Sequence, residues 1–315
     1  MENKQIKALC LSGGGSKGAF VGGMLEYMKL ILNKDYDLYV ASSTGSLLQL
    51  LASINDFKTL KEGYTTLTLN DIYSISPFSK SSKANNIKMS LFNIIKMIFL
   101  KKQPTFGDTH NLKKLINRFF PKEKYIESLN KNKNLIACVS NLSKMKAEYY
   151  SSKELGINGY DEFCDWTWIS CNAVPFTSLV KRGIENDYYC DGGYLNNMPI
   201  SKAISEGATI IDAFNTSSEI NDFSTNINIG NNPLTLISRL FEMFLIDSAK
   251  KDIEYAKEMA KDKDVILNIY YVPRKLIDNP MFFDRKMMLG WWNEGYEYMK
   301  NKSVTCETIT LNKNV

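Results

Sequence analysis

The first segment of the chain with residue types suited to chemistry is the glycine-rich run Gly13-Gly14-Gly15-Ser16-Lys17-Gly18. It lies between a strand expected at 6–11 and a helix expected at 17–32. Glycines let the backbone turn tightly and approach a ligand closely, and the N–H groups at a helix N-terminus attract an anion. We therefore expect a site for a phosphate or for the oxyanion of a reaction intermediate, with a purely structural turn as the alternative.

The same run fits the G-x-G-x-x-G fingerprint of dinucleotide-binding proteins through Gly13, Gly15 and Gly18. That fingerprint also needs an acidic residue at the end of the second strand, where this chain has Ala41-Ser42-Ser43. A P-loop is excluded because no Gly-Lys-Ser/Thr follows at the required spacing. A nucleotide-binding α/β protein that uses the glycine run stays open as an alternative.

Ser43 lies in Ala41-Ser42-Ser43-Thr44-Gly45, between a strand expected at 37–41 and a helix. A serine on a sharp strand-to-helix turn exposes its hydroxyl above the sheet, as in the G-x-S-x-G nucleophile elbow. Ser43 has the register of that motif because Gly45 lies two residues on, although Ala41 replaces the first glycine. The alternative is an ordinary helix N-cap serine.

Asp191 opens a third segment, Asp191-Gly192-Gly193, directly after a strand expected at 188–190. A carboxylate at a strand end can act as a base, and the glycines beside it permit close approach. The alternative is an Asp-Gly turn that closes a hairpin.

His110 is the single histidine, which excludes any zinc site or catalytic apparatus that needs two histidines. A Ser–His–Asp triad is disfavoured, since the histidine of α/β-hydrolases follows the acid and His110 precedes Asp191. The six cysteines have no metal-ligand spacing, so we expect no metal and a reducing, cytoplasmic location. The net charge of +5 is too small to indicate a nucleic-acid polymer as partner.

The elements that must position these residues alternate between strand-like and helical patterns, which predicts an α/β layered fold. The length of 315 residues fits one large domain or two small ones. Further strands are expected at 135–139, 147–151, 209–214 and 265–271, and long helices at 233–260 and 284–300. No apolar run has the length of a transmembrane helix, and no signal-peptide pattern is present.

Residues 74–107 form a connection too long for a simple turn, and the segment 89–100 within it reads as a helix that is apolar around most of its circumference. Asn93 and Lys96 form its narrow polar stripe. A buried core helix fits this pattern, and so does a lid or membrane-contact helix, which we predict. The surrounding lysines would favour an anionic membrane surface. They are Lys80, Lys83, Lys88, Lys96, Lys101 and Lys102.

Three segments in this order resemble the patatin-like phospholipase family. They are the run from Ser12 to Gly18, Ser43-Thr44-Gly45-Ser46, and Asp191-Gly192-Gly193 with the following Asn196-Asn197-x-Pro199. Their order and spacing agree with the family from residue 6 to about 214. The stretch Cys171-Asn172-Ala173-Val174-Pro175 is similar to the family's S-x-A-x-P segment, with cysteine in place of serine.

The resemblance implies a single domain over 1–315 with a three-layer α/β/α fold and a mostly parallel sheet. It also implies a lipid acyl hydrolase acting on glycerophospholipids or lysophospholipids. Family members use a Ser–Asp dyad and an acyl-enzyme without metal or cofactor, so Ser43 would be the nucleophile and Asp191 its base. The run Gly13-Gly14-Gly15 would form the oxyanion hole. Lys17 would be a candidate contact for a substrate phosphate.

The resemblance also implies a location and partners. A membrane phospholipid as substrate indicates a cytoplasmic protein with peripheral membrane contact. Some bacterial members are anti-phage effectors that a cyclic oligonucleotide switches on; this role, with such an activator, stands beside lipid turnover and an injected toxin. A homo-oligomer stays open. So does a catalytically idle binding or storage protein on the same fold, although intact Ser43 and Asp191 argue against it.

Overall fold

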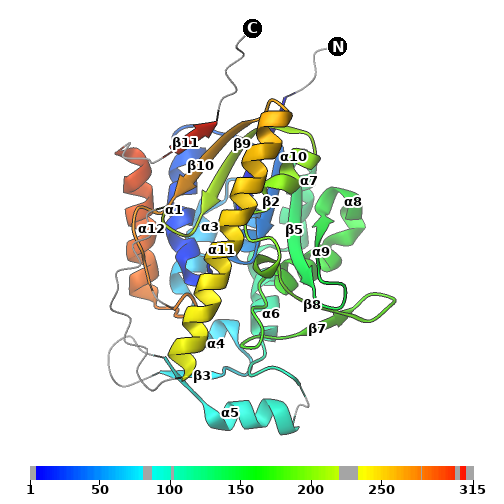
Figure 1. The fold of residues 1–315 in the computed structure, drawn as a ribbon, viewed down its shortest axis with the longest axis vertical. Coiled ribbons are helices and arrows are strands. Elements are labelled where there is room, and N and C mark those ends of the chain that lie inside the picture. The colour runs from blue at the N-terminus through cyan, green and yellow to red at the C-terminus, as the bar shows by residue number, and fades with distance from the viewer. Residues whose placement is uncertain are drawn as a thin grey trace.

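The computed structural model describes residues 5–80, 87–100, 103–219, 233–277, 279–301 and 306–309. Its central sheet has nine strands in the order β11-β10-β9-β1-β2-β5-β8-β7, with β6 also paired to β5 (Figure 1). The strands are β1 (Ile6–Leu11), β2 (Leu38–Ser42), β5 (Asn134–Asn141), β6 (Lys146–Ser151), β7 (Val180–Arg182), β8 (Asp187–Asp191), β9 (Ala208–Asn215), β10 (Ile266–Tyr271) and β11 (Cys306–Ile309). A separate hairpin pairs β3 (Phe78–Lys80) with β4 (Ile87–Met89).

The middle of the sheet is parallel. Strands β10, β9, β1, β2 and β5 run in one direction, and β6, β7, β8 and β11 run against their neighbours. Parallel strands are covered on both faces and therefore read as continuous apolar runs, and residues 8–11 of β1 and 38–42 of β2 are buried throughout. This burial explains why the sequence pattern identified both strands.

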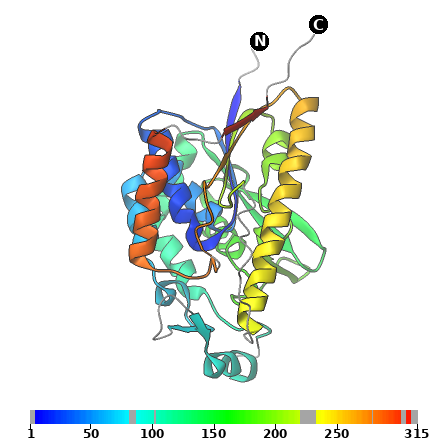
Figure 2. The same ribbon diagram turned by 60° about the vertical axis from the view of Figure 1, so that its left-hand side comes forward.

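Helices cover both faces of the sheet, as Figures 1 and 2 show. The larger apolar core lies under α1 (Gly18–Leu30), α2 (Thr44–Ala52), α3 (Phe57–Thr66), α4 (Leu69–Ile72), α6 (His110–Phe119), α7 (Lys122–Asn130), α8 (Ser152–Leu155), α9 (Tyr160–Ser170) and α12 (Arg285–Lys300). The smaller core lies under α10 (Ile200–Ser205) and α11 (Pro233–Asp262). The predicted three-layer α/β/α fold with a mostly parallel sheet is thus confirmed.

The apolar segment at 89–100 departs from the expected single helix. Met89 belongs to β4, α5 spans Leu91–Ile95, and a π-helical turn continues through Lys96–Leu100. The interpretation as a buried core helix is wrong, because four of its apolar side chains are 55–76% exposed. They are Leu91, Phe92, Ile95 and Phe99.

Asn93, one of the two residues of the polar stripe, faces the protein instead of the solvent. Asn93 Nδ2 donates to the carbonyl oxygen of Ser76 over 2.8 Å, while Met97 is buried. Lys83, Lys101 and Lys102 lie outside the described residues, as do the side chains of Lys80 and Lys88. Within the described residues, no helix is both long and apolar enough to cross a membrane.

Candidate active site

The turn between β2 and α2 places Ser43 at the carboxyl end of a central parallel strand. Its backbone has φ 52° and ψ −127°, a conformation that costs a non-glycine residue of order 1–3 kcal/mol. Hydrogen bonds hold it there: the Ser43 N–H donates to Ser170 Oγ over 2.9 Å, and the Cys171 thiol donates to the Ser43 carbonyl over 3.1 Å. This strained turn has the geometry that exposes a nucleophilic hydroxyl.

Strand β5 explains how Asp191 reaches Ser43 from 148 residues away. Parallel β2 pairs with the first part of β5 and ends with Ser42 opposite Cys138. Antiparallel β8 pairs with the last part of β5 and ends with Asp191 opposite Val139. Both strands therefore end beside successive residues of β5, and Ser43 and Asp191 meet where they end.

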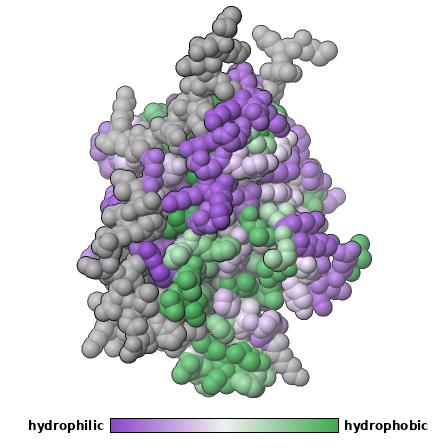
Figure 3. Space-filling model, viewed as in Figure 1, coloured by the Kyte–Doolittle hydropathy of each residue, from purple (hydrophilic) through white to green (hydrophobic). Residues whose placement is uncertain are grey.

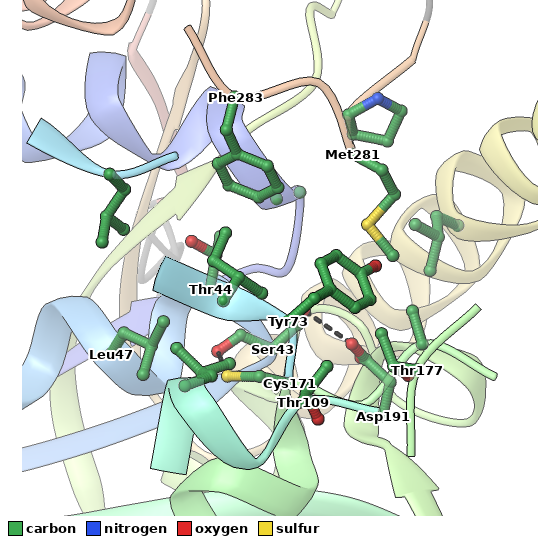
Figure 4. Close-up of a pocket in the computed structure, with 18 of the residues that line it drawn as sticks. Ser43, Thr44, Leu47, Tyr73, Thr109, Cys171, Thr177, Asp191, Met281 and Phe283 are labelled. Carbon is green, nitrogen blue, oxygen red and sulfur yellow. Dashed lines mark hydrogen bonds between the residues drawn. The ribbon is translucent and has the colours of Figure 1, made fainter. Parts of the chain in front are cut away.

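Ser43 and Asp191 form a direct hydrogen bond, drawn in Figure 4, in which Ser43 Oγ donates to Asp191 Oδ2 over 2.7 Å. The other carboxylate oxygen, Oδ1, accepts from the Gly193 N–H over 2.8 Å. Asp191 is only 3% exposed. Burial raises the pKa of its carboxyl from 3.8 to about 7, and the bonds from Ser43 and Gly193 oppose that rise. A carboxylate with this pKa is a far stronger base than a solvated aspartate.

The glycine loop passes directly beside the dyad. A Cβ at Gly13 would lie 2.7 Å from Ser43 Cβ, so only glycine permits this approach. The Gly13 N–H, however, donates to Asn197 Oδ1 over 2.9 Å. This bond engages the Gly13 N–H, so Gly13 supports the loop, and its place in the oxyanion hole stays a prediction.

Gly14 and Gly15 differ from Gly13, since their N–H groups have no hydrogen-bond acceptor among the described residues. Both residues line the same pocket as Ser43 and Asp191. Gly15 has φ +57°, which turns the loop into a short 3-10 helix and then α1. The two N–H groups are thus available to an anion in the pocket.

The pocket around Ser43 encloses about 710 Å³ when the space open to the solvent is included. Its walls come from α2, α3, α6, α11 and the segments at 171–177 and 280–283. Most lining side chains are apolar or aromatic, and the polar groups gather around the dyad (Figure 4). The apolar lining includes Leu47, Tyr73, Phe241, Leu245, Met281 and Phe283.

Lys17 does not line this pocket. Its side chain is buried and faces a separate, smaller cleft together with Thr216, Glu242 and Lys275. Burial lowers the pKa of Lys17, and the charge of Glu242 opposes that shift. We therefore leave Lys17, a predicted contact of a substrate phosphate, out of the site.

His110 also lies outside the pocket. Its side chain is 58% exposed, and Nδ1 lies 2.5 Å from Asp108 Oδ1. The residue before it, Thr109, does line the pocket. The imidazole is therefore engaged at the surface and takes no place beside Ser43 or Asp191.

Residues 170–172 hold both members of the dyad, a role that the sequence did not reveal. Ser170 accepts from the Ser43 N–H, and the carbonyl of Asn172 accepts from the Asp191 N–H over 2.8 Å. Cys171 supplies the thiol bond to the elbow. The stretch beginning at Cys171, which resembles a family motif, was the only sequence signal for this role. The motif did not indicate which atoms of the dyad these residues contact.

Comparisons with known proteins identify the family of the chain. The sequence profile of patatin-like phospholipases matches residues 9–204. A curated protein of Invertebrate iridescent virus 6, named "Probable lipid hydrolase 463L", is 26% identical over 214 residues. That match covers 65% of this chain and 65% of the length of the viral protein. The crystal structure of VipD from Legionella pneumophila aligns with TM-score 0.44 and 15% identity, over 97% of this chain and 68% of VipD.

The profile match includes the glycine loop, Ser43 and Asp191, and it extends over more than half of the chain. The chain therefore belongs to the patatin-like phospholipase family.

Proposed function

We propose that this protein is a phospholipase A or lysophospholipase that cleaves acyl esters of glycerophospholipids with a Ser43–Asp191 dyad. The observation that carries the proposal is the 2.7 Å hydrogen bond from Ser43 Oγ to a buried carboxylate at the base of an apolar pocket. The family and the lipid hydrolase named among the relatives support a lipid as substrate.

The dyad performs the reaction in two halves. Asp191 Oδ2 takes the proton of Ser43 Oγ while that oxygen attacks the carbonyl carbon of the ester. The N–H groups of Gly14 and Gly15 stabilise the resulting oxyanion, an interaction whose loss typically costs roughly 100- to 1000-fold in rate. The ester C–O bond breaks, Asp191 returns the proton to the departing alcohol, and an acyl-enzyme remains. Water, deprotonated by Asp191, then releases the fatty acid and restores Ser43.

An idle storage protein and a nucleotide-binding protein are less consistent with these contacts. An idle protein has no need for a serine held in a strained turn against a buried carboxylate. A dinucleotide site would need an acidic residue at the end of the second strand, where this chain has Ser42 and Ser43. The cyclic-oligonucleotide activator, the defence role and a homo-oligomer stay predictions from the resemblance.

The direct test is the release of fatty acid from vesicles of phosphatidylcholine and phosphatidylglycerol, and from lysophosphatidylcholine, followed by mass spectrometry. We expect free fatty acid together with the matching lysophospholipid or glycerophosphodiester. Release of a phosphorylated headgroup or of diacylglycerol would indicate cleavage of a phosphodiester and would contradict an acyl hydrolase.

A substrate drawn from a membrane requires an apolar surface near the pocket, and two elements offer one. We define the apolar patch as Leu91, Phe92, Ile95 and Phe99 of the α5 segment with Leu236, Leu240, Met243 and Phe244 of α11, all 42–76% exposed. Figure 3 shows hydrophobic colouring on α5 and on the end of α11 above it. Residues Phe241 and Leu245 of the same α11 turns line the Ser43 pocket. The patch thus adjoins the site, and we propose it as the membrane contact.

Ile95→Asp and Phe99→Asp are expected to leave the protein folded and to weaken its binding to anionic vesicles at least about tenfold. Both side chains are exposed, so a carboxylate there costs little in the folded state but opposes insertion into lipid, where each apolar side chain contributes up to roughly 1.5–3 kcal/mol. Vesicle sedimentation beside thermal melting measures both effects.

Ile31→Asp is the matched control for these two variants. Ile31 is 51% exposed and follows α1, at the end of the sheet opposite Ser43. Unfolding of the α5 variants, or unchanged sedimentation of the folded variants, would contradict the membrane contact. Sedimentation should be measured with and without cyclic oligonucleotides, because an activator could be needed to expose the patch.

A further inference from the structure

An apolar cavity adjoins the Ser43 pocket between α2, α3 and α6. Leu47, Tyr64, Leu67 and Leu112 line both spaces and form the wall between them. Beyond this wall, the cavity encloses about 440 Å³ when the space open to the solvent is included. It is lined by apolar residues, among them Leu51, Leu60, Leu115 and Phe119. All three helices belong to the described part of the chain, and none of these lining side chains carries a charge.

Hydrogen bonds join Tyr64 of the wall to Thr44, the residue that follows the nucleophile Ser43. The Tyr64 hydroxyl lies 2.5 Å from Thr44 Oγ1 and donates to the Thr44 carbonyl over 2.9 Å. These bonds engage the Tyr64 hydroxyl, the only polar side-chain atom among the four wall residues. Tyr64 therefore presents its ring to both spaces. Unlike Tyr64, the three leucines have no polar tether and can change rotamer.

Gly63 keeps the cavity open at the middle of α3. The three atoms nearest to a Cβ there would be ring carbons of Phe119, at 3.8–3.9 Å, which is ordinary contact. No positive φ requires glycine at this position, and glycine is unfavourable inside a helix. What the missing side chain provides is therefore space between α3 and α6.

We propose that this cavity receives the distal carbons of the substrate acyl chain, while the ester carbon lies at Ser43. The inference rests on the proposed function and adds a preference for longer chains. Hydrocarbon is the chemistry that fits, since a polar group entering this lining would lose its hydrogen bonds to water without replacement. The chain enters when the leucines of the wall turn aside.

The test is a series of p-nitrophenyl esters from butyrate through hexanoate, octanoate and decanoate to laurate, each below its micelle concentration. For the natural sequence, we expect kcat/KM to rise about fourfold per methylene until the cavity is full, the factor expected for burying one CH₂ group. Gly63→Leu fills the cavity from α3, and Leu115→Trp fills it from α6. In each variant, the laurate-to-butyrate ratio of kcat/KM should fall at least about tenfold.

Gly290→Leu is the matched control, because Gly290 also lies inside a helix and a Cβ there would meet nothing within 4 Å. Its chain-length profile should match that of the natural sequence. A natural profile that does not rise beyond butyrate would overturn the inference, as would an unchanged profile in a filled variant that circular dichroism shows to be folded. Either result leaves the dyad intact, whereas hydrolysis of no ester at all would reject the proposed function as well.

Discussion

Ser43→Ala is expected to reduce ester and phospholipid hydrolysis by at least about 10⁴-fold, to background, while the protein keeps its fold. The substitution removes the oxygen that attacks the ester and nothing that holds the elbow. The Ser43 N–H still donates to Ser170, and the Cys171 thiol still reaches the Ser43 carbonyl. Fatty-acid release, turnover of a chromogenic ester and thermal melting measure the effect.

Ser42→Ala is the control for this experiment, since the neighbouring hydroxyl points to the Asn196 carbonyl over 2.6 Å and does not line the pocket. We expect it to retain activity within about tenfold. Turnover like that of the natural sequence in Ser43→Ala would reject the assignment and redirect attention to Ser42 or Ser46.

Asp191→Asn is expected to lower kcat by about 10³- to 10⁴-fold with little change in fold. Asparagine keeps the shape, and its Oδ1 can still accept from the Gly193 N–H. Its NH₂ group then faces Ser43 and cannot take the hydroxyl proton. His110→Ala, in contrast, should keep most activity, because the imidazole is exposed and engaged with Asp108. If His110→Ala lost its hydrolytic activity while Asp191→Asn kept it, the dyad would be rejected.

The pH profile identifies the base independently. Since Asp191 must be ionised to act, kcat/KM should rise about tenfold per pH unit below a pKa of about 7 and level off above it. Histidine ordinarily titrates in the same range, so the profile must be repeated with His110→Ala. The fall of kcat/KM at low pH should be unchanged in His110→Ala. If that fall disappeared in the variant, it would be due to the imidazole and not to Asp191.

Local patterns singled out Ser43 and Asp191 as candidates, because each lies where a strand meets a glycine-containing turn. Each pattern also fitted an ordinary turn or helix cap, and the pairing of the two as a dyad came from the family resemblance. The hydrogen bond between them depends on the register of β2 and β8 along β5, which joins residues far apart in the chain. Nothing in either motif specifies that register. The same holds for Ser170 and Asn172, whose roles follow only from where α9 ends.

For other elements, the sequence pattern was too short to detect or was consistent with more than one structure. Strand β7 has three residues and β11 has four, which is too short for a pattern to emerge. An apolar helix has the same sequence pattern whether it packs in a core or faces outward, so residues 91–100 left both interpretations open. Lys17 lies in the expected motif, yet its side chain points to a different cleft from the one its neighbours line.

The burial of Asp191 also affects the stability of the fold. Below about pH 4 the carboxyl carries its proton in both the folded and the unfolded chain. From there to about pH 7, the folded chain keeps a proton that the unfolded chain releases, so the free energy of unfolding falls as pH rises. A pKa raised from 3.8 to about 7 corresponds to a loss of about 4 kcal/mol. That is a large share of the usual stability of a domain. A neutral side chain that still accepts from the Gly193 N–H, such as asparagine, is therefore expected to raise the stability of the fold at neutral pH.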